Sequence, residues 1–320
     1  MLRYTRYDGN RNSGGSRVDL SALQQKFGLP GVLAFDQQDG LVRCLVTTKQ
    51  ASATVYLQGA HVTAWQPAGA PPCLFLSRKS AFAVGKPIRG GIPVVFPWFA
   101  ADSKPDRVDG HPGPMHGFAR IQDWTLESAR VDFDEFEMHL SLGPTEMSRS
   151  MGYDDFLLRL ELRFGKELAL KLTVVNIGPL PMSFEQALHT YFHVTDIHET
   201  TMTGLEDTAY IDKTDGFEVK PASGASVTFT GPVDRVYQGT TADVRVRDGA
   251  GGRSYTLHKT GSKTTVVFNP GAEMPDVGAW EWHELACAET ANVGENLITL
   301  APGATALMGA RISVAVEARG

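Results

Sequence analysis

The chain has 320 residues, of which 42% are hydrophobic and 21% charged, and its formal net charge is −6. This composition is typical of a soluble globular protein, and with no basic stripe it argues against nucleic acid or an anionic membrane as a partner. The polar segment at 10–16 argues against a signal peptide, and no apolar run approaches the ~20 residues that span a bilayer. Three widely separated cysteines favour reduced thiols over a disulfide framework. We therefore expect a cytoplasmic protein.

The first residues divide into a tail and a helix. Residues 1–16 are rich in Gly, Asn, Ser and Arg, which predicts a flexible N-terminal tail. A short helix is expected next, capped by Asp19 and ended by Gly28 and Pro30. Its apolar face comprises Leu20, Leu23 and Phe27.

After this helix the hydrophobic pattern changes to a period of two, which predicts β-strands. The alternating or strand-like segments lie at 136–142, 158–164, 168–174, 297–300 and 312–316. The second and third of them read as a hairpin around a Gly165-Lys166 turn, and the last two flank a turn at 301–303. Because no helical pattern separates the strands, βαβ units are not expected. We predict an all-β fold, a large antiparallel β-sandwich formed by residues 17–320 as a single domain.

His189 is the first candidate for chemistry, since it lies among apolar residues in a segment that resembles a strand. A partly buried His with a pKa near neutrality suits a general acid. A core His bonded to the backbone explains the pattern equally well. A metal site formed by His189, His193 and His198 is not expected, because the Glu of a zincin motif is missing and the cysteines are remote.

Glu289 is the second candidate, in the apolar segment 284–290. A carboxylate on a buried strand is costly unless it is paired or its pKa is raised. That cost favours a functional role, although a buried salt bridge would also account for it.

Several further residues carry weaker signals. Arg89 precedes two glycines, which allow close approach to a ligand, but a solvated Arg in a turn is also consistent. His116 and Arg120 would share one face of an extended chain, but a pair in a surface loop is the more common explanation of this spacing. Asp234 and Asp276 could each be ordinary turn residues.

Taken together, these segments resemble the glucose-6-phosphate 1-epimerase (hexose-6-phosphate mutarotase) family of the galactose-mutarotase-like superfamily. Any one segment is weak evidence, but the ordered set covers roughly residues 33–316. The matching segments are 58–62, 76–77, 87–99, 116–120, 187–192, 233–237, 268–271, 274–276 and 287–290.

The resemblance implies a role for each candidate residue. His189 would be the general acid and Glu289 the general base of an anomer exchange. The residues implied to bind the sugar phosphate or line its site are Arg89, His116, Arg120 and Asp234. Met115 stands where relatives often carry a polar residue that touches the ligand, so it is a candidate contact with an altered side chain.

The implied chemistry needs no cofactor. Glu289 would take the proton of the anomeric hydroxyl while His189 protonates the ring oxygen, and reclosure of the open sugar gives the other anomer. The expected partner is a small-molecule sugar phosphate, bound by a monomer or weak oligomer. Two alternatives stay open: an aldose 1-epimerase for unphosphorylated sugars, and a non-catalytic sugar-binding module.

Overall fold

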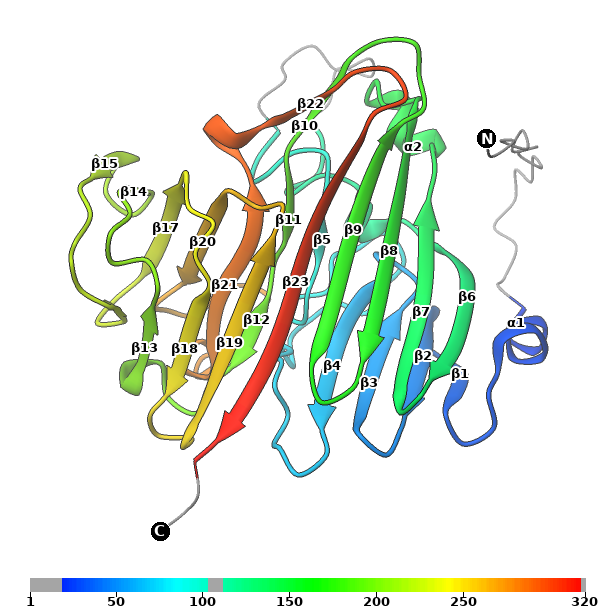
Figure 1. The fold of residues 1–320 in the computed structure, drawn as a ribbon, viewed down its shortest axis with the longest axis horizontal. Helices are drawn as coiled ribbons and strands as arrows, with labels where there is room; N and C mark the ends of the chain where they lie inside the picture. The colour runs from blue at the N-terminus through cyan, green and yellow to red at the C-terminus, as the bar shows by residue number, and fades with distance from the viewer. Residues whose placement is uncertain (1–18, 103–111, 318–320) are drawn as a thin grey trace.

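The computed structural model describes residues 19–102 and 112–317. Its largest sheet has nine strands from the middle and late parts of the chain, between Thr125 and Val316, all paired antiparallel (Figure 1). In spatial order these strands are β16 (Val227–Thr228), β13 (Thr200–Thr203), β18 (Val244–Asp248), β19 (Arg253–Thr260), β23 (Thr305–Val316), β9 (Leu168–Asn176), β8 (Phe156–Phe164), β7 (Glu135–Leu142) and β6 (Thr125–Asp132).

A second, eight-stranded sheet carries Asp234 and Glu289, and two of its strands flank His189. Its strands are β15 (Glu218–Lys220), β14 (Tyr210–Asp212), β17 (Val233–Gln238), β20 (Thr264–Asn269), β21 (Leu285–Asn292), β11 (Gln186–Leu188) and β5 (Val94–Val95), with β12 (Tyr191–His193) as a further partner of β21. All of its pairings are antiparallel as well.

Two smaller sheets and several short helices complete the described part of the chain. The four-stranded sheet contains β1 (Leu33–Gln38), β2 (Leu41–Thr47), β3 (Ala51–Tyr56) and β4 (His61–Pro67), and the two-stranded sheet pairs β10 (Met182–Phe184) with β22 (Ile298–Leu300). The helices are α1 (Leu20–Phe27), α2 (Glu146–Ser150) and the 3₁₀ turns η1 (Ala119–Ile121), η2 (Ile197–Glu199), η3 (Glu281–Glu284) and η4 (Gly294–Asn296). In the described ranges no helix has the length and apolar character needed to cross a membrane.

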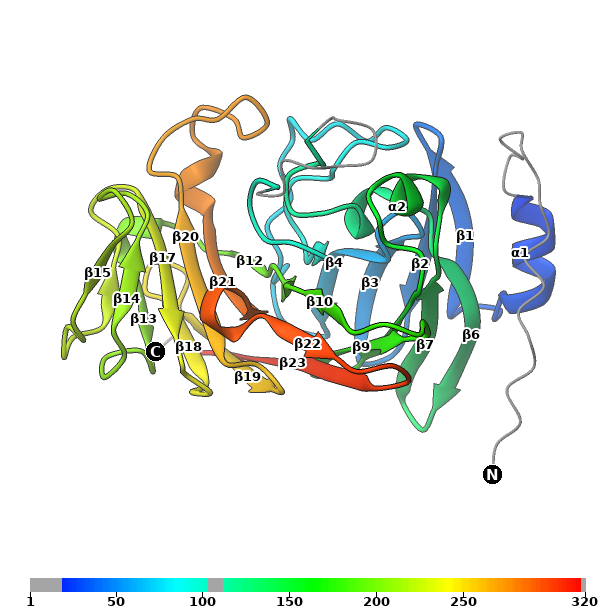
Figure 2. The same ribbon diagram turned by 90° about the horizontal axis from the view of Figure 1, so that it is seen from above.

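The predicted N-terminal helix is confirmed as α1. Oδ1 of Asp19 accepts hydrogen bonds from the backbone N–H groups of Ser21 and Ala22, which caps the first turn. The helix ends at Phe27 and lies at the outer edge of the molecule beside β1 (Figure 2). The predicted tail at 1–16 lies outside the described residues.

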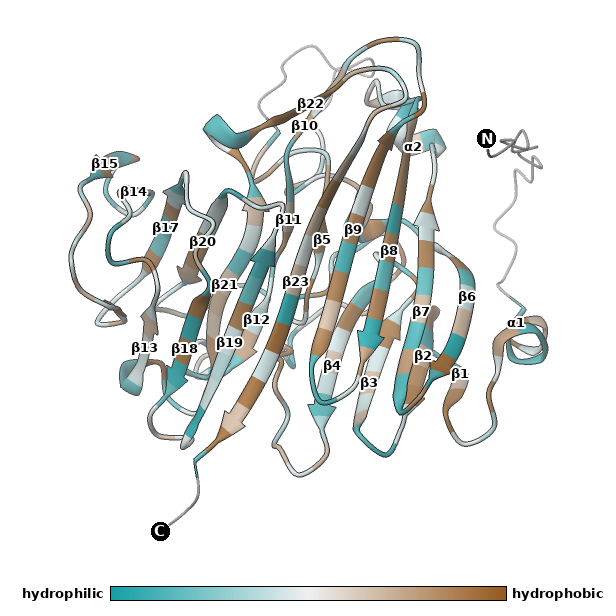
Figure 3. Cartoon of the chain, in the orientation of Figure 1, coloured by the Kyte–Doolittle hydropathy of each residue, from teal (hydrophilic) through white to brown (hydrophobic). Residues whose placement is uncertain are grey.

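The predicted hairpin is formed by β8 and β9, which pair from Phe156 with Asn176 to Phe164 with Leu168. Every second residue of both strands is buried, and Figure 3 shows the matching alternation of apolar and polar residues along them. Each fully buried Leu on this face contributes about 1.5–3 kcal/mol. The C-terminal strand is longer than predicted, because β23 begins at Thr305, soon after the 301–303 turn.

The fold places two small apolar clusters on either side of the candidate residues. Along β11 and β12, Ala187 belongs to one cluster and Tyr191 to the other, with His189 between them. Along β21, Ala291 and Cys287 flank Glu289 in the same way. The apolar packing therefore holds the backbone rigid on both sides of the two polar side chains.

Candidate active site

His189 and Glu289 are brought together by the register of the eight-stranded sheet. The strands β11 and β12 both pair with β21, so that Leu188 lies opposite Thr290 and Tyr191 opposite Cys287. His189 occupies the short gap between β11 and β12, whereas the sequence predicted a strand position. Its Nε2 atom lies 3.3 Å from Oε1 of Glu289, and the two side chains are 6% and 1% exposed. The expected strand position of Glu289 is confirmed.

Burial moves the protonation equilibria of the pair in opposite directions. Loss of solvation raises the pKa of Glu289 well above its ordinary value, and the negative charge of Asp234 adds to this effect. Loss of solvation also lowers the pKa of His189 well below its ordinary value, assisted by His116, Arg89 and Arg120. These shifts favour the form of the pair in which Glu289 holds a proton and His189 is neutral, and transfer of that proton to His189 leaves the net charge of the pair unchanged.

Tyr191 connects this pair to Arg89. Its ring stacks on that of His189 with centroids 4.5 Å apart, and its hydroxyl lies 3.4 Å from Nε2 of His189. Nη1 of Arg89 donates a hydrogen bond to the same hydroxyl over 2.9 Å. Because Arg89 supplies the donor, the tyrosine hydroxyl is free to donate toward the imidazole.

Arg89 is held by backbone geometry that its two glycines permit. Gly90 and Gly91 have φ values of 114° and 63°, and a Cβ on either would lie within 2.4 Å of a neighbouring carbonyl oxygen. The guanidinium contacts Oδ2 of Asp276 at 2.9 Å through both Nε and Nη2. Arg89 is thus a half-buried ion-pair member, not a solvated turn residue, and Asp276 is its partner.

The interpretation that His116 and Arg120 lie on an extended chain is wrong. His116 has a φ of 62° and Gly117 one of 74°, and Arg120 follows in the turn η1. A Cβ at Gly117 would lie 2.0 Å from the carbonyl oxygen of Phe96, so this turn requires glycine. The resulting turn places the His116 ring 5.6 Å from that of His189.

The hydrogen bond that His116 receives fixes its tautomer. The backbone N–H of Ala100 donates to Nδ1 over 3.1 Å, so the ring proton resides on Nε2. Burial and the charges of Arg120, Lys213 and Arg89 lower the pKa of His116 well below its ordinary value. This imidazole therefore remains neutral and offers a single N–H donor beside His189.

Arg120 is the most buried cation of the site. Its Nη2 donates to the carbonyl oxygen of Met115 over 2.7 Å, while its Nε has no hydrogen-bond partner among the described residues. Burial lowers its pKa to about 10. Met115 is 52% exposed, and its hydrogen bond with Arg120 uses the backbone carbonyl. Its predicted ligand contact stays a prediction.

Sequence reasoning missed Lys213, which pairs with Asp234. Nζ of Lys213 lies 2.7 Å from Oδ2 of Asp234, with both side chains about one-fifth exposed, and 5.8 Å from the centre of the Phe99 ring. The Lys213 charge also lowers the pKa of Glu289, so it acts on the same site. Lys213 follows the end of β14, where no local pattern marks a functional residue.

The charges of the site leave one cation without a carboxylate. Arg89 is paired with Asp276, and Lys213 with Asp234. Arg120 forms no ion pair with a carboxylate within the described ranges. A dianionic group entering the site would therefore meet Arg120 as its least compensated positive charge.

The three histidines considered as metal ligands are separated by the fold. His189 belongs to the pair with Glu289, whereas Nδ1 of His193 lies 2.8 Å from Nη2 of Arg253. His198 is exposed and bonds through Nδ1 to the carbonyl oxygen of Phe229. A joint site of these three is not formed.

The antiparallel sheets hold a buried His–Glu pair beside the cations Arg89, Arg120 and Lys213, an arrangement suited to acid–base chemistry on a polar substrate. The sequence model of the aldose 1-epimerase family matches residues 43–311, and the chain belongs to this family. It is an isomerase of the epimerase type.

Relatives resemble the chain along most of its length. A protein of Escherichia coli named "putative glucose-6-phosphate 1-epimerase" is 34% identical over 271 residues, which covers 82% of this chain and 87% of the relative. A protein of Cenchrus ciliaris with the same name is 31% identical over 268 residues, covering 80% and 79%. A crystal structure from Salmonella typhimurium described as a "putative mutarotase" superposes with a TM-score of 0.83 at 28% identity, covering 90% of this chain and 95% of the other.

Proposed function

We propose that this chain interconverts the α and β anomers of a hexose 6-phosphate, with His189 as general acid and Glu289 as general base. The observation that carries the proposal is the buried contact of 3.3 Å between His189 Nε2 and Glu289 Oε1. The relatives from Escherichia coli and Cenchrus ciliaris are both named "putative glucose-6-phosphate 1-epimerase".

The proposed reaction uses the single proton of the pair. In the catalytic form His189 holds it, and Glu289 is a carboxylate. Glu289 removes the proton from the anomeric hydroxyl while His189 delivers its proton to the ring oxygen, so the C1–ring oxygen bond breaks and a free aldehyde forms. Rotation about C1–C2 and the reverse proton transfers close the ring as the other anomer. The pair ends with the same number of protons, which is consistent with its neutral total charge.

The surrounding residues would bind and orient the sugar phosphate. We assign the phosphate to Arg120, with Arg89 as a second donor, because a phosphate dianion favours fixed positive charge with several N–H groups. Asp234 would accept hydrogen bonds from sugar hydroxyls, and His116 would donate through Nε2. These roles extend the chemistry of the side chains and are part of the proposal.

The wider setting is proposed with the reaction. We expect residues 17–320 to act as one domain, as a monomer or weak oligomer without nucleic acid or membrane, and in the cytoplasm. Support comes from the three cysteines, which are buried and unpaired, as expected in a reducing compartment.

The proposal is tested by measuring anomer exchange with NMR at equilibrium. Exchange of glucose 6-phosphate should accelerate above the buffer rate, and far more than exchange of free glucose or galactose. Equal acceleration of free sugars would favour the unphosphorylated alternative. Binding of glucose 6-phosphate without any acceleration would favour a non-catalytic sugar-binding module.

A further inference from the structure

Asp196, His198 and His283 form a cluster of potential metal ligands that shares no residue with the candidate active site. Each offers one ligand atom, and these atoms all lie within 4.8 Å of one another. Asp196 and His198 belong to η2 and its cap, whereas His283 comes from η3, far along the chain. Nδ1 of His283 lies 3.9 Å from Oδ1 of Asp196.

The tautomer of His198 leaves a nitrogen available for an ion. Its Nδ1 lies 2.9 Å from the carbonyl oxygen of Phe229, and a carbonyl can only accept. Nδ1 therefore carries the proton, and Nε2 of the neutral ring presents its lone pair. Metal-bound histidines commonly donate their second ring N–H to a carbonyl or carboxylate in this way.

The spacing of the two imidazoles fits a shared tetrahedral ion. When zinc binds two imidazole nitrogens at about 2.0–2.1 Å in tetrahedral geometry, the two ring centres lie roughly 5 Å apart. The centroids of His198 and His283 are 5.2 Å apart, with the rings nearly perpendicular. The 3.9 Å between His283 Nδ1 and Asp196 Oδ1 would have to close to roughly 3.4 Å for both atoms to bind one tetrahedral ion.

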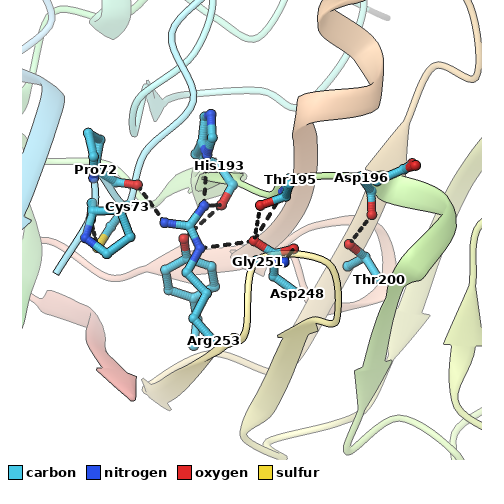
Figure 4. Close-up of polar contacts among 11 residues, drawn as sticks. Pro72, Cys73, His193, Thr195, Asp196, Thr200, Asp248, Gly251 and Arg253 are labelled. Atoms are coloured by element: carbon cyan, nitrogen blue, oxygen red, sulfur yellow. Dashed lines mark hydrogen bonds and ion pairs between the residues drawn. The ribbon is translucent and has the colours of Figure 1, made fainter. Parts of the chain in front are cut away.

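The backbone that carries Asp196 is firmly held (Figure 4). The hydroxyl of Thr200 donates to the Asp196 carbonyl oxygen over 2.8 Å, and the preceding residue, Thr195, donates through N and Oγ1 to the buried Asp248. Nε of Arg253 completes this network with a contact of 2.9 Å to the same Asp248 carboxylate. A preorganised ligand loop lowers the entropic cost of binding an ion.

The segment that carries His283 is anchored as well. The carboxylate of Glu281 accepts hydrogen bonds from Ser77 Oγ, from the Arg78 backbone N–H and from the Gly278 backbone N–H. An ion between η2 and η3 would therefore connect two fixed segments and act as a structural link.

The second cluster of this kind does not fit a cation. Glu137 and His139, with Glu161, also converge, but Arg130 and Arg163 each approach the Glu137 carboxylate at 2.7 Å. Two guanidinium groups already neutralise that carboxylate, so a metal ion would have to displace them. The cluster around His198 has no such cation pairs among the described residues.

We propose that Asp196, His198 and His283 form a structural binding site for a divalent transition-metal ion of the zinc type. Two imidazole nitrogens and one carboxylate oxygen suit Zn²⁺, Co²⁺ or Ni²⁺ better than Mg²⁺ or Ca²⁺. Three protein ligands leave a fourth tetrahedral position, which water can occupy because His198 is exposed to solvent.

The test is calorimetric titration of the metal-free full chain with Zn²⁺, followed by Co²⁺ spectroscopy. We expect the native chain to bind one ion, and the affinity to fall at least about tenfold in the double variant His198→Gln/His283→Gln. Bound Co²⁺ should give the intense visible absorption of tetrahedral geometry, and Zn²⁺ should raise the melting temperature of the native chain only.

A matched variant separates this site from adventitious binding. His258→Gln removes another surface histidine, which contacts Asp243 outside the cluster, and should leave the stoichiometry unchanged. Anomer exchange should be unaffected in the double variant, because neither residue belongs to the candidate active site. Failure of the native chain to bind Zn²⁺ would overturn the proposal, and so would equal binding by the double variant.

Discussion

Lys213 and Asp234 form an ion pair of 2.7 Å, and both of its charges act on Glu289. Their charges act on Glu289 in opposite directions, since Asp234 raises its pKa and Lys213 lowers it. The ion pair therefore limits how strongly the candidate base holds its proton.

Replacing Lys213 should change the pKa of Glu289 measurably. In Lys213→Met, Asp234 acts on Glu289 uncompensated, so the pKa of Glu289 rises further and the alkaline limb of the pH–rate profile moves to higher pH. We expect kcat/KM at neutral pH to fall about tenfold. Lys220→Met, which removes a partly exposed lysine paired with Asp215 and Glu218, serves as the control. An unchanged profile in Lys213→Met would mean that Lys213 has no electrostatic role.

The pH dependence of the activity follows from the shifted pKa values of His189 and Glu289. At low pH both residues are protonated, and activity should appear as the pair loses its first proton, below the ordinary His value of 6.5 because the pKa of His189 is lowered. Activity should decline again when Glu289 loses the last proton of the pair, above the ordinary Glu value of 4.5. The expected profile of kcat/KM is a bell whose acidic limb lies below pH 6.5. An acidic limb above that pH would contradict the assigned environment of His189.

Glu289→Gln should stabilise the fold. Because the folded state raises the pKa of Glu289, its contribution to stability is present below the ordinary Glu pKa and is lost as pH rises through the folded value. Glutamine does not ionise, so the variant should gain about 0.5–2 kcal/mol at neutral pH, and the gain should grow with pH. Denaturant melts at pH 5 and pH 8 check this. A destabilised variant with the same pH dependence as the native chain would contradict it.

Arg120 should distinguish phosphorylated from free sugars. Arg120→Met removes the one site cation without a carboxylate partner in the described ranges, so KM for glucose 6-phosphate should rise roughly 10–100-fold. Turnover of any accepted free sugar should change little. Arg130→Met, a change to a partly exposed arginine on β6, is the control. Equal losses for both sugar classes would place Arg120 in structural support instead of phosphate binding.

The sequence predicted those features that depend on neighbouring residues. Short segments of the sequence suffice to predict the alternation of β8 and β9, the cap of α1 and the strand position of Glu289. The roles proposed for His189 and Glu289 came from the family resemblance. No short segment of the sequence indicates that β11 and β12 pair with β21, which lies about 100 positions further along the chain.

The missed features depend on contacts between distant segments. Asp276 lies in a turn, as predicted, but its ion pair with Arg89 was missed because the two residues are 187 positions apart. Lys213 follows a short strand, and only the pairing of β14 with β17 brings it to Asp234. The turn at His116 was missed because a positive φ at a non-glycine residue has no clear sequence signature.

The account rests on His189 and Glu289 acting together as acid and base. The most direct measurement is the NMR exchange rate between the anomers of glucose 6-phosphate with the native chain, Glu289→Gln and His189→Asn at equal concentration. We predict strong acceleration by the native chain and a loss of about 10²–10⁴-fold in each variant, with glucose 6-phosphate binding retained. Either variant exchanging the anomers at the native rate would contradict the account.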